Sequence, residues 1–195
     1  MVFWAGILAA ALFAWLSVKI GFYETWTMLF NIVISIYLSV FLTPAIISMI
    51  PAAGDTAYGN ALTLITIAVG AFLILHGVSY SFLTSRFSVW FPRPLDNVGS
   101  GLLGFLAGLL VWSFLVLTTS ASPISQTSFA RNIGLASTVE KTNVPYIAWW
   151  CDLINTVVAA GDNKHTTRAA ISRLLKPAKE QMESIKPDGM KSKDS

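Results

Sequence analysis

Residues 61–83 have the sequence ALTLITIAVGAFLILHGVSYSFL and contain no Asp, Glu, Lys or Arg. A helix of about 20 mostly apolar residues crosses the roughly 30 Å hydrocarbon core of a bilayer. Three further stretches have the same character, namely residues 2–18, 26–50 and 99–117. They lack the polar face of a soluble helix and the alternation of a β-barrel strand. The sequence therefore predicts an all-α membrane protein, a compact bundle of four transmembrane helices.

The composition supports this fold class. Of the 195 residues, 54% are hydrophobic and 12% are charged, whereas a soluble domain carries about 25% charged residues. Most of the charge lies after residue 120. The first apolar stretch lacks the positively charged start of a cleaved signal peptide, so we expect it to remain as a helix. The one cysteine, Cys151, cannot form a disulfide within the chain.

We expect residues 1–119 to form the four-helix transmembrane domain. Residues 120–161 are predicted to form a polar linker and an amphipathic interfacial helix, in which Trp149 and Trp150 lie at the membrane boundary. In that arrangement Asp152, Asn155 and Thr156 face water. Residues 162–195 are predicted to form a basic, partly disordered tail. The alternative is that residues 144–161 form a fifth span, which would place Asp152 in hydrocarbon at a cost of roughly 2.5–3.5 kcal/mol.

Positive charges in the short connections predict the orientation. Lys19 lies in the first connection, Arg86 and Arg93 lie in the third, and the second contains no Lys or Arg. Because cytoplasmic loops are enriched in Lys and Arg, we expect the first and third connections to be cytoplasmic. Four spans then place both chain ends on the other side of the membrane.

Small residues recur every four positions in the fourth apolar stretch, at Ser100, Gly104 and Gly108. Such a stripe allows another helix to approach closely. The other helix could belong to the same bundle, which we favour because small residues are frequent in membrane helices, or to a second molecule.

Three polar residues are candidates for roles near or inside the membrane. Asp96 follows Pro94 just before the fourth stretch, where a carboxylate is expected to cap the helix that follows. His76 is the one titratable residue well inside a predicted span. We expect it to form a structural hydrogen bond, with Asn31 or Ser35 as partner, more readily than to handle protons, because a proton pathway usually needs several ionisable groups.

The sequence shows no catalytic constellation. Neither His76, in a span, nor His165, in the tail, is placed to serve Cys151 as a base. Spacings typical of metal ligands, glycine-rich phosphate loops and aromatic-basic nucleic-acid motifs are also missing from the sequence. We therefore expect a non-enzymatic protein without a cofactor, whose partners are the lipid bilayer and other envelope proteins or itself, and not nucleic acid.

Two segments resemble the colicin V production protein (CvpA) family of bacterial inner-membrane proteins. Gly21-Phe22 is similar to the Gly-Phe pair of that family's first loop. Leu95-Asp96 with Ser100, Gly104 and Gly108 is similar to its L-D-R-x-x-G-x-x-x-G-x-x-R-G stretch. Residues 146–155 resemble the Trp-rich segment after its last span, and the resemblance covers roughly residues 2–158. Asn97 and Ala107 depart from it, since the family usually has arginines there.

The resemblance implies a multi-pass protein of the bacterial inner membrane. It implies a non-enzymatic accessory or scaffold factor in colicin V production and envelope maintenance, which acts by binding other envelope proteins. The alternative is a small channel or transporter subunit that oligomerises through the fourth helix. A transport path should show a continuous polar stripe, and the sequence offers Asn31, Ser35 and His76 for it.

Overall fold

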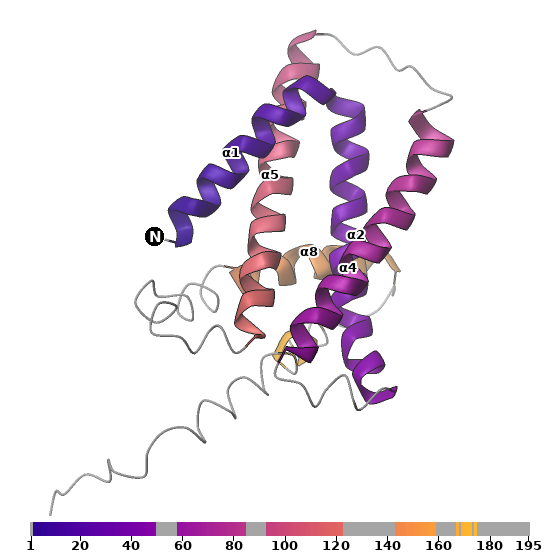
Figure 1. Ribbon diagram of the computed structural model, residues 1–195. Coiled ribbons are helices and arrows are strands. Elements are labelled where there is room, and N and C mark those ends of the chain that lie inside the picture. The colour runs from indigo at the N-terminus through magenta and orange to yellow at the C-terminus, as the bar shows by residue number, and fades with distance from the viewer. Residues whose placement is uncertain are drawn as a thin grey trace, which may run out of the picture.

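The computed structural model describes residues 2–49, 58–84, 93–122, 143–158, 167, 169–172 and 174. In this part of the chain there are helices and no strands (Figure 1). The elements are α1 (Val2–Ile20), α2 (Phe22–Met49), α4 (Gly59–Ser79), the π-helical turn η1 (Tyr80–Thr84), α5 (Arg93–Ser120) and α8 (Val144–Val158). Four helical segments are long and apolar enough to cross a membrane. The predicted helical membrane bundle is confirmed; most of the predicted tail lies outside the described residues.

The first two spans are joined by a single non-helical residue. Gly21 has a φ of 103°, a left-handed conformation that glycine adopts without a clash of Cβ. The chain therefore reverses between Ile20 and Phe22, and the predicted connection over residues 19–25 is wrong. Residues 22–25 instead lengthen α2 to 28 residues, or about 42 Å at 1.5 Å per residue, which exceeds the hydrocarbon thickness.

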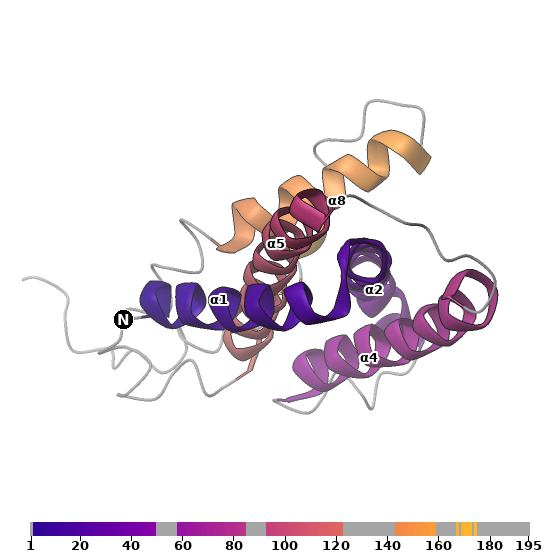
Figure 2. The ribbon, with the colours of Figure 1, turned by 90° about the horizontal axis from the view of Figure 1, so that it is seen from above.

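The order of the helices in space differs from their order in the chain. α5 lies between α1 and α2, and α2 also packs against α4 (Figures 1 and 2). Although the turn at Gly21 joins α1 to α2, the two helices touch little and diverge beyond it. Helices joined by a short connection usually pack as neighbours, but this pair does not, because α5 lies between them.

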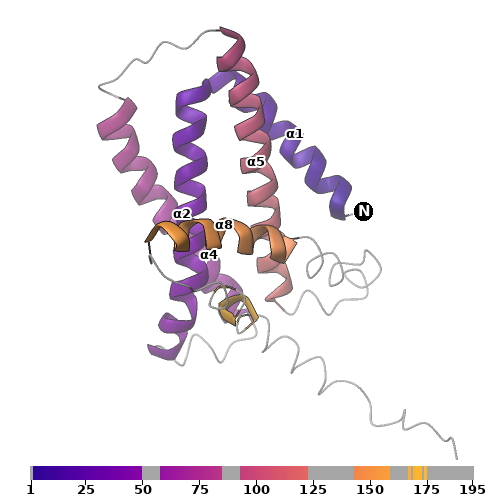
Figure 3. The same cartoon turned by 180° about the vertical axis from the view of Figure 1, so that it is seen from behind.

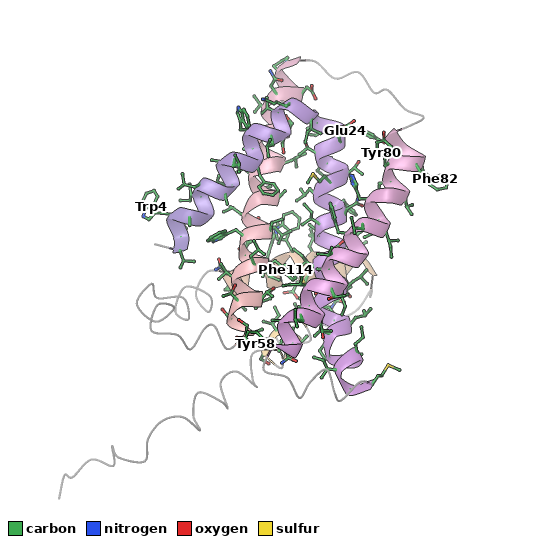
Figure 4. All side chains as sticks on the ribbon, viewed as in Figure 1. Trp4, Glu24, Tyr58, Tyr80, Phe82 and Phe114 are labelled. Atoms are coloured by element: carbon green, nitrogen blue, oxygen red, sulfur yellow. The ribbon has the colours of Figure 1, made fainter. Side chains whose placement is uncertain are left out.

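The main core lies where α2 faces α5. Val40, Leu110 and Leu117 are fully buried there, and Phe114 points into the same space (Figure 4). On the outer helices the apolar side chains point away from the bundle, as Trp4 on α1 and Phe82 after α4 do in Figure 4. Both are 69% exposed. This distribution is the one expected for helices whose outer surfaces contact lipid tails, because such surfaces need not be polar.

α8 does not run parallel to the spans. It crosses α2 and α5 on the side of the bundle away from α4 (Figures 2 and 3). Ile147 and Cys151 belong to the main core together with Ile171 and Leu174. α8 is therefore an integral part of the packed structure.

Two connections share one end of the bundle. The turn from α1 to α2, the end of η1 and the start of α5 all lie toward the upper end of the bundle in Figure 1. Lys19 and Arg93 consequently lie toward the same end, as four alternating spans require. Arg86, the third charge used to predict the orientation, lies outside the described residues.

Candidate functional site

Asp96 joins two helices that are far apart in the sequence. Its Oδ1 accepts a hydrogen bond from the backbone N–H of Phe22, with 2.7 Å between N and O. The first N–H groups of a helix lack intrahelical acceptors and carry partial positive charge, so the carboxylate stabilises the start of α2. Asp96 was expected to cap α5; it lies in the first turn of that helix, at the positive end of its dipole, while the hydrogen bond of its Oδ1 goes to α2.

The residues around this bond fix the corner between the helices. A Cβ added to Gly99 would lie 2.6 Å from Cδ2 of Phe22, so only glycine lets the ring pack on α5. Thr25 Oγ1 donates to the carbonyl oxygen of Gly21 at 2.7 Å. We call Gly21, Phe22, Asp96 and Gly99 the corner site.

The stripe of Ser100, Gly104 and Gly108 faces α1 of the same chain. A Cβ on Gly104 would lie 2.8 Å from the carbonyl oxygen of Phe13, and it would also overlap Ser17. A Cβ on Gly108 would lie 2.7 Å from Cα of Ala10. Ser100 is fully buried and donates to the carbonyl oxygen of Asn97 at 3.1 Å. The contacts are those of packing within the bundle.

α1 carries the complementary small residues, which the sequence reasoning missed. Gly6, Ala10 and Ser17 are all buried on the side that meets α5. A Cβ on Gly6 would lie 2.8 Å from Cδ1 of Trp112. The four-residue spacing of Gly6 and Ala10 is visible in the sequence, and pairing it with the stripe on the fourth helix would have predicted the neighbours.

A second feature missed from the sequence is a polar stripe on α2. Asn31, Ser35, Ser39 and Thr43 recur every four residues, and all are buried. Ser39 Oγ donates to the carbonyl oxygen of Leu64 on α4 at 2.7 Å. Ser35 and Thr43 donate to carbonyl oxygens one turn earlier in α2, at 2.6 Å each. The stripe therefore lies along the contact between α2 and α4.

Asn31 does not pair with His76. Its side-chain amide exchanges hydrogen bonds with Ser79 Oγ at 3.1 and 3.2 Å. His76 is exposed, and its ring stacks on Phe72 with 5.5 Å between centroids. The expected hydrogen bond from His76 to α2 is thus wrong, because Asn31 is paired with Ser79 and the imidazole is exposed.

α8 is held to the bundle by apolar and polar contacts. Ile147, Ala148 and Cys151 are buried against α2 and α5. Tyr146 Oη donates to the carbonyl oxygen of Leu106 at 3.2 Å. Asn155 is 9% exposed and accepts from the hydroxyl of Tyr37 at 3.4 Å. Asn155 was expected to face water, which is wrong, because the amide lies on the packed side of the helix.

The outer side of α8 is apolar as well. Trp149, Leu153 and Val157 are exposed at four-residue spacing, while Trp150 packs at the edge of the core. Asp152 and Thr156 lie between these two apolar sides. The polar sector that could meet water is therefore narrow, as expected for a helix that has the bundle on one side and lipid on the other.

Cys151 is shielded from solvent in this arrangement. Burial, and secondarily the charge of Asp152, raises the pKa of its thiol to about 12. A thiol in this state is not a nucleophile near neutral pH, because the thiolate is the reactive form. Within the described part of the chain, no group of three or more His, Cys, Asp or Glu could hold a metal ion.

Comparison with protein-family models, with curated proteins and with solved structures finds no match to this chain.

Proposed function

We propose that this membrane protein is a non-enzymatic accessory or scaffold factor of the bacterial inner membrane, of the kind represented by the colicin V production proteins. The hydrogen bond from Phe22 N–H to Asp96 carries the proposal. Gly21-Phe22 and Leu95-Asp96 are two separate segments that resemble this family, and the structure brings them into contact at one corner site. Residues that act together in a fold are expected to recur together in related proteins.

The use of polar groups inside the bundle supports a scaffold. Ser35, Ser39 and Thr43 donate to backbone carbonyl oxygens, and Asn31 pairs with Ser79. Such hydrogen bonds hold the helices together, and they occupy the polar groups that would otherwise bind a transported solute. Binding of other envelope proteins would then fall to the outer surfaces, including the exposed side of α8 with Trp149 and Leu153.

Complementation tests the proposal. The chain is expressed in bacteria that carry the genes for colicin V but lack their own member of the family. We expect it to restore toxin production. Asp96→Ala should reduce this effect, because the corner site loses the hydrogen bond between Asp96 and the N–H of Phe22. Glu24→Ala is the control, since Glu24 is an exposed acid near the same corner. Absence of toxin from cells whose membranes contain the wild-type chain would refute the proposal.

The second candidate function is a small channel or transporter subunit, whose path would follow the continuous stripe of buried polar residues on α2. Because α1 covers Gly104 and Gly108, an oligomer would have to form through another surface than the fourth helix's stripe. Permeability of protein-containing liposomes to glycerol distinguishes the candidates. A channel along the stripe predicts permeability that Ser39→Val abolishes, whereas a scaffold predicts liposomes as tight as protein-free ones.

A further inference from the structure

One histidine lies in a membrane span without a hydrogen-bond partner. His76 of α4 is exposed, and its contact with Phe72 is a stacking of the two rings. Among the described residues, none forms a hydrogen bond with either ring nitrogen of His76. Stacking engages the face of the imidazole and leaves its edge, where both nitrogens lie, unpaired. His76 therefore presents a polar group on the surface of a span.

The depth of His76 makes this exposure costly. α4 runs antiparallel to α2 (Figure 1), and its Ser79 is hydrogen-bonded to Asn31. Asn31 lies about 14 Å along α2 from Phe22 of the corner site, at 1.5 Å per residue. His76 precedes Ser79 by about one helical turn, so it lies roughly 18 Å from the corner site. In a hydrocarbon core of roughly 30 Å, this position is close to the centre.

Lipid tails are a poor neighbour for this side chain. Ionisable side chains within spans almost always face the interior of a bundle or a water-filled cavity, because lipid tails offer them no hydrogen bond. The described part of the chain provides no cover, since α4 packs mainly against α2 and touches α5 little. A Cβ added to the neighbouring Gly77 would meet nothing within 4 Å. We therefore expect a protein group from another chain beside His76.

Exposed side chains on both sides of His76 extend this surface along α4. Val69, Leu73 and Tyr80 are all exposed. Together with His76 they recur at alternating intervals of four and three residues, which places them along one side of a helix. We call these four residues the α4 strip. It offers apolar area to a partner helix together with one hydrogen-bonding side chain near the bilayer centre, and such groups hold membrane helices together.

A second copy of this chain matches the α4 strip. Copies that insert in the same orientation place His76 at the same depth, and a two-fold axis along the membrane normal brings identical residues of two helices together. A neutral imidazole has one donor and one acceptor, so the ring of His76 is complementary to the ring of its own copy. The small-residue stripe on α5 is not available for such a contact, because α1 already covers it.

We propose that the protein forms a two-fold symmetric dimer through the α4 strip, in which the imidazole of His76 in one copy donates a hydrogen bond to the imidazole in the other. Leu73 and Tyr80 of both copies pack around this pair. The dimer goes beyond the proposed scaffold function and is independent of it, since it uses none of the corner site. It also leaves α8 uncovered, because α8 lies on the side of the bundle away from α4 (Figure 2).

Disulfide cross-linking tests this contact while His76 is still present. The purified chain is placed in liposomes with a single cysteine at Leu73 or at Ile74, in a Cys151→Ala background. Both positions are exposed, but Ile74 lies about 100° around the helix from Leu73. Mild oxidation should link the Leu73→Cys chains into dimers, because a disulfide needs two Cβ atoms within about 4.5 Å. The Ile74→Cys chains should stay largely unlinked, and equal cross-linking of the two variants, or none of either, would overturn the proposal.

Variants of His76 test the hydrogen bond itself. Energy transfer between donor- and acceptor-labelled copies in liposomes, over a range of protein-to-lipid ratios, measures the affinity of the dimer. His76→Leu should weaken dimerisation about 3- to 30-fold, as expected for losing a hydrogen bond between membrane helices. His76→Asn keeps a donor and an acceptor, so it should dimerise like the wild type.

Ile74→Ala is the matched control for these variants. It removes an exposed side chain of α4 outside the α4 strip, and it should leave the affinity of the dimer unchanged. A wild-type chain that stays monomeric at every protein-to-lipid ratio would refute the dimer. Equal affinities of the wild type and His76→Leu would show that the imidazole does not hold the two copies together.

Discussion

Gly104→Ala should weaken the packing of α1 on α5, whereas Gly70→Ala on α4 should not. A Cβ at position 104 would lie 2.5 Å from Cβ of Ser17 and 2.8 Å from the carbonyl oxygen of Phe13. The second of these atoms belongs to the backbone of α1, so no side-chain rotation relieves the overlap and the helices must separate. At Gly70 nothing lies within 4 Å of an added Cβ.

The expected difference between the two variants follows from these distances. Overpacking of a close contact costs typically about 1–3 kcal/mol. An alanine in a helix interior gains up to about 1 kcal/mol over glycine, and this gain cancels when the two variants are compared. For a chain of this size 1 kcal/mol shifts the unfolding midpoint by roughly 2–4 °C. We therefore expect Gly104→Ala to unfold about 2–12 °C below Gly70→Ala.

Loss of helical circular dichroism on heating, with both variants in the same detergent, measures this difference. Gly101→Ala should lie between them, because its added Cβ would be 3.4 Å from Cγ2 of Val18. The mass of the purified particle should not change, since α1 and α5 belong to one chain. Equal unfolding midpoints for Gly104→Ala and Gly70→Ala would refute the packing argument. A changed particle mass would show that the stripe of Ser100, Gly104 and Gly108 contacts a second molecule.

Two further predictions concern the corner site and α8. Asp96→Ala removes the cap of α2 and should lower the free energy of unfolding by about 1 kcal/mol; Asp96→Asn, which keeps an acceptor oxygen, should lose less, and equal losses would argue against capping. Cys151 should react slowly with a thiol reagent, and its rate should stay low up to pH 9, because the pKa near 12 keeps the thiol protonated. A cysteine introduced at Thr156, which is exposed, should react quickly in a Cys151→Ala background; fast labelling of Cys151 in the folded protein would contradict its burial.

The number and type of spans could be predicted because lipid imposes a strong and local constraint. Apolar runs such as residues 61–83 have to be helices of about 20 residues in a bilayer, whatever surrounds them. The helix ends were less predictable. The apolar stretches left residues 19–25 as a connection, yet a single glycine with positive φ is enough to reverse the chain, and the residues after it join α2.

The partners of individual residues depend on the order of helices in space, which a single apolar run does not encode. Asp96 caps α2 and not α5 because the two helix starts meet at the corner site. Asn31 pairs with Ser79 and not His76, whose imidazole is exposed and stacks on Phe72. In α8, the amphipathic pattern predicted a water-facing side that includes Asn155. In the structure, Asn155 instead accepts a hydrogen bond from Tyr37 on α2.

The placement of α5 between α1 and α2 also has a consequence for how the protein is made. α1 is synthesised first, yet the surface that accepts Ala10 and Ser17 belongs to α5, roughly half the chain later. Until α5 enters the bilayer, the small residues of α1 have only lipid beside them, and the bundle lacks its central helix. Contacts so distant in sequence form late. A ribosome stalled before residue 93 would thus leave α1 to diffuse apart from α2 and α4, tethered only by the turn at Gly21.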